Sequence, residues 1–282
     1  MNYEVYNENN VAVIVTDEQL EEAMKQNAKE ISIEILDAMS MARQSRFSPY
    51  LCNALYHNKL KARIKAIYGL LSLLDQNNVP ALKEKEQSIS EDDMYAPISE
   101  KAILQAVLIR LEKGPEGAYK AFFKGDIPPL VKTLLLHNYF SDMPLSVDDI
   151  KFIVDVLEAY LNKTEPWMHK MKQDEYEDDI IAPFEGLMRE AEESTLLNNL
   201  PSELNEKLIK IGRQILKMKI DSYAKECIAT FAKGLPPKVA YLMLEPIMDG
   251  SARGDVRKEL NKTLKVLRQK EQNEVNKDVH GA

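Results

Sequence analysis

Apolar residues recur at helical spacing along most of this chain. After residue 16, leucine, isoleucine, valine, methionine and alanine follow one another three or four positions apart, with charged residues between them. That spacing gathers the apolar side chains on one face of an α-helix. The pattern predicts an all-α fold, either a multi-helix bundle or an irregular helical array of about ten to twelve helices.

The first sixteen residues follow a different pattern. Apolar and polar residues alternate over 2–6, a polar tetrad occupies 7–10, and the run 11–15 favours β-structure. Two such runs around a polar turn predict a short β-hairpin, or an extended arm. Because a lone hairpin is marginally stable in water, it should lie on the helices, pair with another chain or move as an arm. Val11 and Val13 are therefore candidate partner-binding residues.

Local signals predict where helices begin and end. Thr16 and Ser146 each start a capping-box pattern, and Ser99 is a suitable N-cap. The first of these should begin a long helix over 17–43. The segment 77–98 is polar and bounded by prolines, which predicts a long surface loop.

These patterns divide the chain into five expected parts. They are an arm or hairpin at 1–16, an N-terminal helical part at 17–164, an acidic connector at 165–182, a C-terminal helical part at 183–275 and a disordered tail at 276–282. Residues 121–131 resemble residues 230–239 in having a phenylalanine, a Lys-Gly pair, two prolines and a valine. Two independent helix junctions or one duplicated helical unit would each explain that similarity.

The stretch 164–179 concentrates unusual residues in the middle of the chain. It holds the single tryptophan and the densest acidic run. In one interpretation its apolar residues fill a core between helical layers, and its acidic end is a solvated connector. In the other, the apolar residues line a partner groove with an acidic rim. The candidate partner-binding residues here are Trp167, Met168, Met171 and Tyr176.

One predicted helix carries a basic face. Its candidate residues are Lys59, Lys61, Arg63 and Lys65. A solvated side of an amphipathic helix explains such a face, and a nucleic-acid interface is the alternative. The formal charge of −8 disfavours nucleic acid and favours another protein as partner, one with a basic surface.

Composition narrows the chemistry further. Cys52 and Cys227 have no zinc-site or disulfide spacing, which fits the reducing cytoplasm, although export by a signal that composition does not reveal stays open. No apolar run is long enough for a membrane span, and no P-loop, Rossmann glycine pattern or nucleophile elbow occurs. We therefore expect no catalytic residue, no metal and no cofactor. The sequence leaves the oligomeric state open.

The sequence favours a non-enzymatic protein-binding adaptor, regulator or secretion-system component that acts through helical surfaces. The first alternative is an all-α enzyme using scattered carboxylates. The second is a nucleic-acid-binding regulator that uses the face at 59–65. An exposed apolar surface would support the adaptor, and a closed polar pocket with shifted carboxylate pKa values would support the enzyme.

Overall fold

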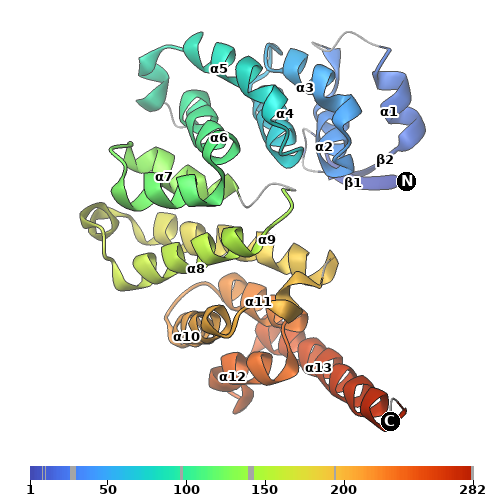
Figure 1. Cartoon of the computed structure of the whole chain (residues 1–282), viewed down its shortest axis with the longest axis vertical. Coiled ribbons are helices and arrows are strands. Elements are labelled where there is room, and N and C mark those ends of the chain that lie inside the picture. The colour runs from blue at the N-terminus through green and yellow to red at the C-terminus, as the bar shows by residue number, and fades with distance from the viewer. Residues whose placement is uncertain are drawn as a thin grey trace. The chain divides into compact units, whose positions relative to one another are not determined.

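A computed structural model of the chain describes residues 1–7, 9, 11–25, 30–95, 98–138, 143–193 and 195–280, and the side chains at 95, 173–179, 192–193 and 274–280 lie outside its description. The described residues form the helices α1 to α13 and one N-terminal β-hairpin (Figure 1). The all-α prediction with an N-terminal hairpin is confirmed. The chain divides into two compact units, Met1–Pro144 and Leu145–Ala282.

Unit 1 is the hairpin followed by helices that pack in succession. Its elements are β1 (Asn2–Tyr6), β2 (Ala12–Thr16), α1 (Asp17–Ala23), α2 (Ile33–Ala42), η2 (Ser45–Phe47), α3 (Ser48–Ala54), α4 (Leu60–Ser72), η3 (Gln76–Asn78), α5 (Val79–Gln87), η4 (Glu91–Tyr95), α6 (Glu100–Lys124) and α7 (Pro129–His137). The hairpin packs on α2, α2 on α4, α4 on α6, and α6 on α5 and α7. Leu36, Leu70 and Leu104 are fully buried in these layers.

The contact between α2 and α4 includes a buried hydrogen bond. The hydroxyl oxygens of Ser40 and Ser72 lie 3.1 Å apart. Ser72 donates to the carbonyl of Tyr68 at 3.0 Å, so Ser40 is the donor to Ser72. Both hydroxyl groups are therefore satisfied inside an apolar interface.

Two predictions for unit 1 need correction. The helix expected over 17–43 is two helices, α1 and α2, and residues 26–29 between them lie outside the described part. The loop expected at 77–98 contains α5, which has a proline in its first turn and buries Leu82. Leu82 is the one fully buried residue of α5, so the sequence of this helix shows little apolar periodicity. The packing of α5 on α6 is what stabilises it as a helix. Within α6 the helical geometry is interrupted at Gly114, which adopts φ +65° and is followed by Pro115.

Unit 2 begins with α8, earlier than the predicted connector. Its elements are α8 (Val147–Asn162), η6 (Pro166–Lys170), α9 (Gln173–Glu193), η7 (Leu196–Asn199), α10 (Ser202–Lys217), α11 (Ser222–Phe231), η8 (Ala232–Gly234), α12 (Pro237–Met248) and α13 (Gly254–His280). The stretch 165–182, predicted as a connector, forms η6 and the first half of α9. Charge repulsion disfavours burial of an acidic run but does not prevent a helix, and α9 buries Phe184 and Leu187 further along.

The helices of unit 2 pack in pairs. α10 packs on α12, α9 on α11, and α11 on α13. The capping box predicted at Ser146 is present, because its hydroxyl accepts from the Asp149 amide at 3.2 Å and its own amide donates to the Asp149 carboxylate at 2.9 Å. α10 and α12 approach closely at Gly212, where a Cβ atom would lie 2.6 Å from Cγ of Met243.

The end of the chain differs from the predicted disordered tail at 276–282. α13 continues as far as His280, and residues 281–282 lie outside the described part. This tail has no apolar period, yet it follows the packed residues Val256, Leu260 and Leu267 of the same helix. A helix already nucleated by packing can extend residue by residue without a second nucleation cost.

The two similar segments, 121–131 and 230–239, correspond to two similar helix junctions. One lies between α6 and α7, the other between α11 and α12, and each second helix starts with a proline in its first turn. Phe122 and Phe231, at matching positions, are both fully buried. A common origin of the two junctions stays a hypothesis.

Candidate protein-interaction site

The inner face of the hairpin fixes it to unit 1. The strands pair antiparallel, with Tyr3 opposite Val15 and Val5 opposite Val13. Tyr3, Val5 and Val15 are buried, and β1 and β2 both contact α2. Of the three arrangements that the sequence allows for the hairpin, the structure shows the one in which it lies on helices.

The outer face of the hairpin is apolar and exposed. Tyr6 is 57% exposed and Ile14 is 54% exposed. Tyr6 lies opposite Ala12, so Ile14 is its diagonal neighbour on the same face, within reach of an aromatic ring. Val11, which directly precedes β2, is also more than half exposed. We call Tyr6, Val11 and Ile14 the hairpin patch.

Sequence reasoning found this patch only in part. Val11 belongs to it, whereas Val13 points to the inner face and is half-buried. Tyr6 and Ile14 were not among the predicted residues, although both have even numbers in strands whose odd-numbered residues face the helices. The period of two along each strand places Tyr6 and Ile14 on one face, but it does not tell which face meets the helices.

The residues predicted around Trp167 lie within unit 2. The Trp167 ring packs edge-on against Tyr160 of α8, with ring centroids 5.7 Å apart and an interplanar angle of 83°. Met168 is buried and Met171 is half-buried. The side chain of Tyr176 lies outside the described part. The described contact of Trp167 is thus with a neighbouring helix of the same unit, as in the core interpretation.

The predicted basic face is divided between solvent and internal ion pairs. Lys59 and Lys61 are exposed. Arg63 pairs with the buried carboxylate of Glu100 at 2.8 Å, and Lys65 pairs with Asp37 of α2 at 2.6 Å. Two of the four predicted cations therefore stabilise contacts between helices and are already neutralised.

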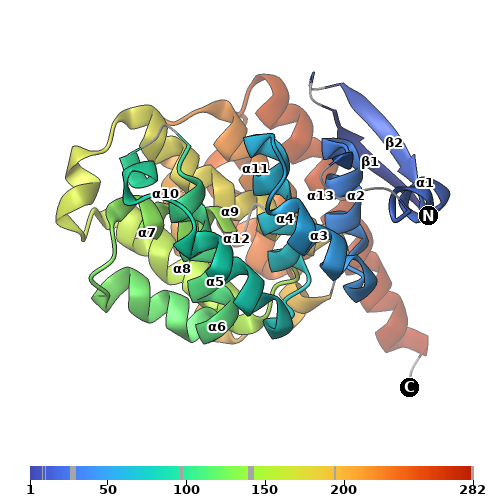
Figure 2. The ribbon, with the colours of Figure 1, turned by 90° about the horizontal axis from the view of Figure 1, so that it is seen from above.

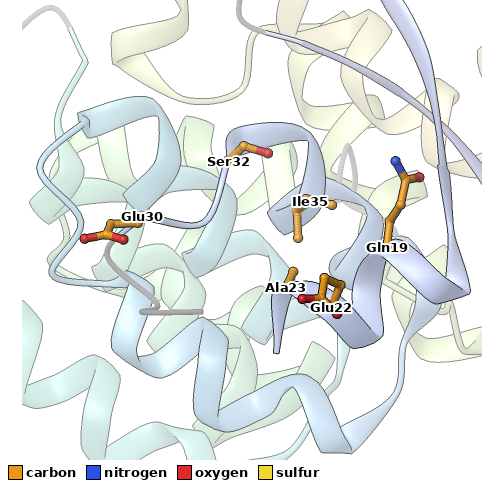
Figure 3. A pocket seen from close by; sticks show the side chains of 6 residues that line it. All are labelled: Gln19, Glu22, Ala23, Glu30, Ser32 and Ile35. Carbon is orange, nitrogen blue, oxygen red and sulfur yellow. The ribbon is translucent and has the colours of Figure 1, made fainter. Parts of the chain in front are cut away.

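A pocket of about 270 Å³ opens between α1 and α2 (Figure 3). Its lining residues are Gln19, Glu22, Ala23, Glu30, Ser32 and Ile35. The Glu22 carboxylate forms an ion pair with Lys25 at 2.8 Å, which neutralises part of the acidic lining. Glu30 directly follows residues 26–29, which lie outside the described part. We assign this pocket no ligand.

Two groups between α9 and α11 have pKa values that are raised by their burial. The Tyr223 hydroxyl donates to Oε1 of Glu185 at 2.7 Å. Burial raises the pKa of the Glu185 carboxyl, and burial raises the pKa of the Cys227 thiol to about 12. A thiol with that pKa stays protonated at neutral pH and is a poor nucleophile.

Among the described residues, no group of three or more His, Cys, Asp or Glu side chains has an arrangement that could hold a metal ion. None of the helices in the described part of the chain is both long and apolar enough to cross a membrane.

Fold and surface together define the class of protein: an all-α helical array with an N-terminal hairpin that exposes an apolar patch. The sequence matches no protein-family model, and a comparison with curated proteins gives no match either.

Proposed function

We propose that the protein is a non-enzymatic protein-binding adaptor or regulator, and that the hairpin patch is one of its docking surfaces. The observation that carries the proposal is the contrast between the two faces of the hairpin. Its inner face is buried on α2, whereas its outer face exposes more than half of Tyr6 and Ile14, and Val11 beside β2 is exposed to the same degree. A rigidly seated apolar patch is typical of a protein-docking surface, because little ordering entropy is lost on binding.

The charge of the chain suggests the character of the partner. A formal charge of −8 favours a partner surface rich in lysine and arginine. Helical surfaces that expose Leu130, Leu242 and Met248 are further candidates for contact. We place the protein in a reducing compartment such as the cytoplasm, because Cys52 and Cys227 are both free thiols.

Affinity capture from a lysate of the native host, read out by quantitative mass spectrometry, tests the proposal. The wild type is compared with the double variant Tyr6→Ser and Ile14→Ser, whose changes lie on the exposed face. The matched control is Met41→Ser and Ile98→Ser, which removes two exposed apolar side chains outside the proposed contact surfaces. Circular dichroism should be the same for all three proteins.

A protein recovered by the wild type and by the control, but depleted at least about tenfold by the hairpin variant, would support the proposal. The affinity of that protein for each variant is then measured by calorimetry with purified material. Equal recovery by all three baits would exclude the hairpin patch as a docking surface.

A further inference from the structure

The backbone pairing of the hairpin follows a strict alternation. The Asn7 amide donates to the Val11 carbonyl at 3.0 Å, and the Asp17 amide donates to the Met1 carbonyl at 3.2 Å. In an antiparallel pair, hydrogen-bonded residue pairs alternate with pairs that do not bond each other. Both ends of the ladder use odd-numbered residues, so odd-numbered residues carry the bonds throughout. The amides and carbonyls of even-numbered residues point away from the partner strand.

On β2 these outward groups belong to Ala12, Ile14 and Thr16. The Thr16 amide already donates to Oε1 of Gln19 at 2.8 Å. In the described part of the chain, the outward groups of Ala12 and Ile14 have no backbone partner. Figure 2 shows β2 as the outer strand of the hairpin, with β1 between it and α2. β2 therefore presents an open strand edge.

We propose that a second copy of this chain covers this edge, and that the two β2 strands pair antiparallel about a two-fold axis at Val13. In that register Ala12 lies opposite Ile14 of the other copy, and Val13 lies opposite its own counterpart. The four amides and four carbonyls that the two copies expose at Ala12 and Ile14 all find partners, in four hydrogen bonds. This register leaves the bond between Thr16 and Gln19 intact.

The absence of charged residues in β2, and the presence of one in β1, favours β2 as the self-pairing strand. β2 reads Ala-Val-Ile-Val-Thr and holds no charge, proline or bulge, which are the usual protections of an edge strand. The other edge belongs to β1, whose central residue is Glu4. Self-pairing there in the equivalent register, about Val5, would make the Glu4 side chains of the two copies diagonal neighbours on one face, and like charges that close repel each other.

The exposure of Val13 fits the same arrangement. Val13 faces the helices like Val15, yet Val13 is half-exposed whereas Val15 is only 3% exposed. The counterpart of Val13 in the second copy would cover its free side. Self-pairing does not depend on the proposed function, because it joins the hairpins edge to edge and leaves the hairpin patch of each copy exposed.

Sedimentation of the full chain tests the proposal. The wild type should sediment at twice the 32.2 kDa of one chain in a concentration-dependent way. Ile14→Pro removes an amide that the hairpin itself does not use, and proline is tolerated on such an edge. It should weaken the dimer by about tenfold or more, because two of the four intermolecular bonds are lost. Ile14→Thr keeps the amide and the β-propensity and should still dimerise.

Disulfide trapping tests the register itself. Val13→Cys should form an intermolecular disulfide under mild oxidation, because opposed residues of a non-hydrogen-bonded pair are close enough for one. The control, Asn9→Cys, places an exposed thiol in the hairpin turn, away from its own counterpart. The wild type, which contains Cys52 and Cys227, gives the background.

A dimer that Ile14→Pro weakens and Val13→Cys traps would establish the pairing. A monomeric wild type without trapping would overturn it. A monomeric wild type that loses a captured partner protein on Ile14→Pro would also overturn it, and would assign the edge to a foreign strand. A dimer that is insensitive to Ile14→Pro would place the contact elsewhere and refute the pairing.

Discussion

Arg63 holds the Glu100 carboxylate at two points and so joins α4 to α6. Nε of Arg63 lies 2.9 Å from Oε1 of Glu100, and Nη2 lies 2.8 Å from Oε2. The Glu100 side chain is 5% exposed, and Lys85 adds a third contact at 3.4 Å. A cation that appears in the sequence as part of a solvated face thus has a structural role.

Replacement of Arg63 should destabilise unit 1. Arg63→Gln leaves a buried carboxylate with only Lys85 beside it, and the expected loss is about 3 kcal/mol of unfolding free energy. Lys61→Gln, an exposed neighbour on the same helix, should change that free energy by less than about 0.5 kcal/mol. Urea denaturation of both variants measures the difference, and equal midpoints would contradict the structural role of Arg63.

The stability of unit 2 should depend on pH through Glu259. Burial raises the pKa of this carboxyl, but hydrogen bonds from Lys233 and Lys262 outweigh burial and hold the pKa at about 2, against an ordinary value of 4.5. A carboxyl with a depressed folded pKa stabilises the fold above its unfolded pKa. That stabilisation is lost as the pH falls through the folded pKa. The window therefore lies between pH 4.5 and about 2.

Glu259→Gln should remove this contribution, about 1 to 2 kcal/mol at neutral pH once solvent screening is allowed for. The variant should also show a flatter loss of stability on acidification than the wild type. Glu206→Gln, at an exposed position of α10, serves as the control. Parallel stability profiles of the wild type and Glu259→Gln between neutral and acid pH would rule out this assignment.

Trp167 should stabilise the packing of η6 on α8. Because the ring is half-buried and packs on Tyr160, we expect Trp167→Ala to cost about 2 kcal/mol, less than the loss of a fully enclosed ring. Met168→Ala should cost at least as much, since Met168 is 1% exposed. His169→Ala, at an exposed position, is the control. An unchanged denaturation midpoint for Trp167→Ala would mean that the ring contributes to something other than folding.

Gly212→Ala should destabilise unit 2 although alanine is the better helix former. The added Cβ would lie 2.6 Å from Met243, and overpacking of this kind costs about 1 to 3 kcal/mol. In a Met243→Ala background the space is free, so the same substitution should become neutral or stabilise by up to about 1 kcal/mol. A double-mutant cycle measures this reversal. Additive effects would show that the two residues are not in contact.

Local features of the fold could be predicted from sequence. The capping boxes at Thr16 and Ser146 and the cap at Ser99 form as expected, because each depends on side chains and amides within three residues. The unbroken helix over 17–43 and the loop at 77–98 were wrong. Packing against α4 and α6, which lie further along the chain, decides those segments and leaves no local signal.

The candidate site was less predictable for the same reason. Alternation identified the strands, but the face that meets α2 is fixed only by packing. The sequence therefore predicts Val13 as a partner-binding residue, whereas the exposed residue is its neighbour Ile14. In the same way, the partner of Arg63 is a glutamate 37 residues further along the chain, which no pattern within one helix reveals.

The close approach of α10 and α12 has a chemical consequence for Met243. Its sulfur would lie 2.8 Å from a Cβ atom at Gly212, and the side chain is completely buried. Conversion to the sulfoxide adds a polar oxygen, for which such a tightly filled space has no room. The native fold shields the thioether from oxidants. We expect a chain oxidised at Met243 before α12 docks to pack α10 and α12 less closely until the sulfoxide is reduced.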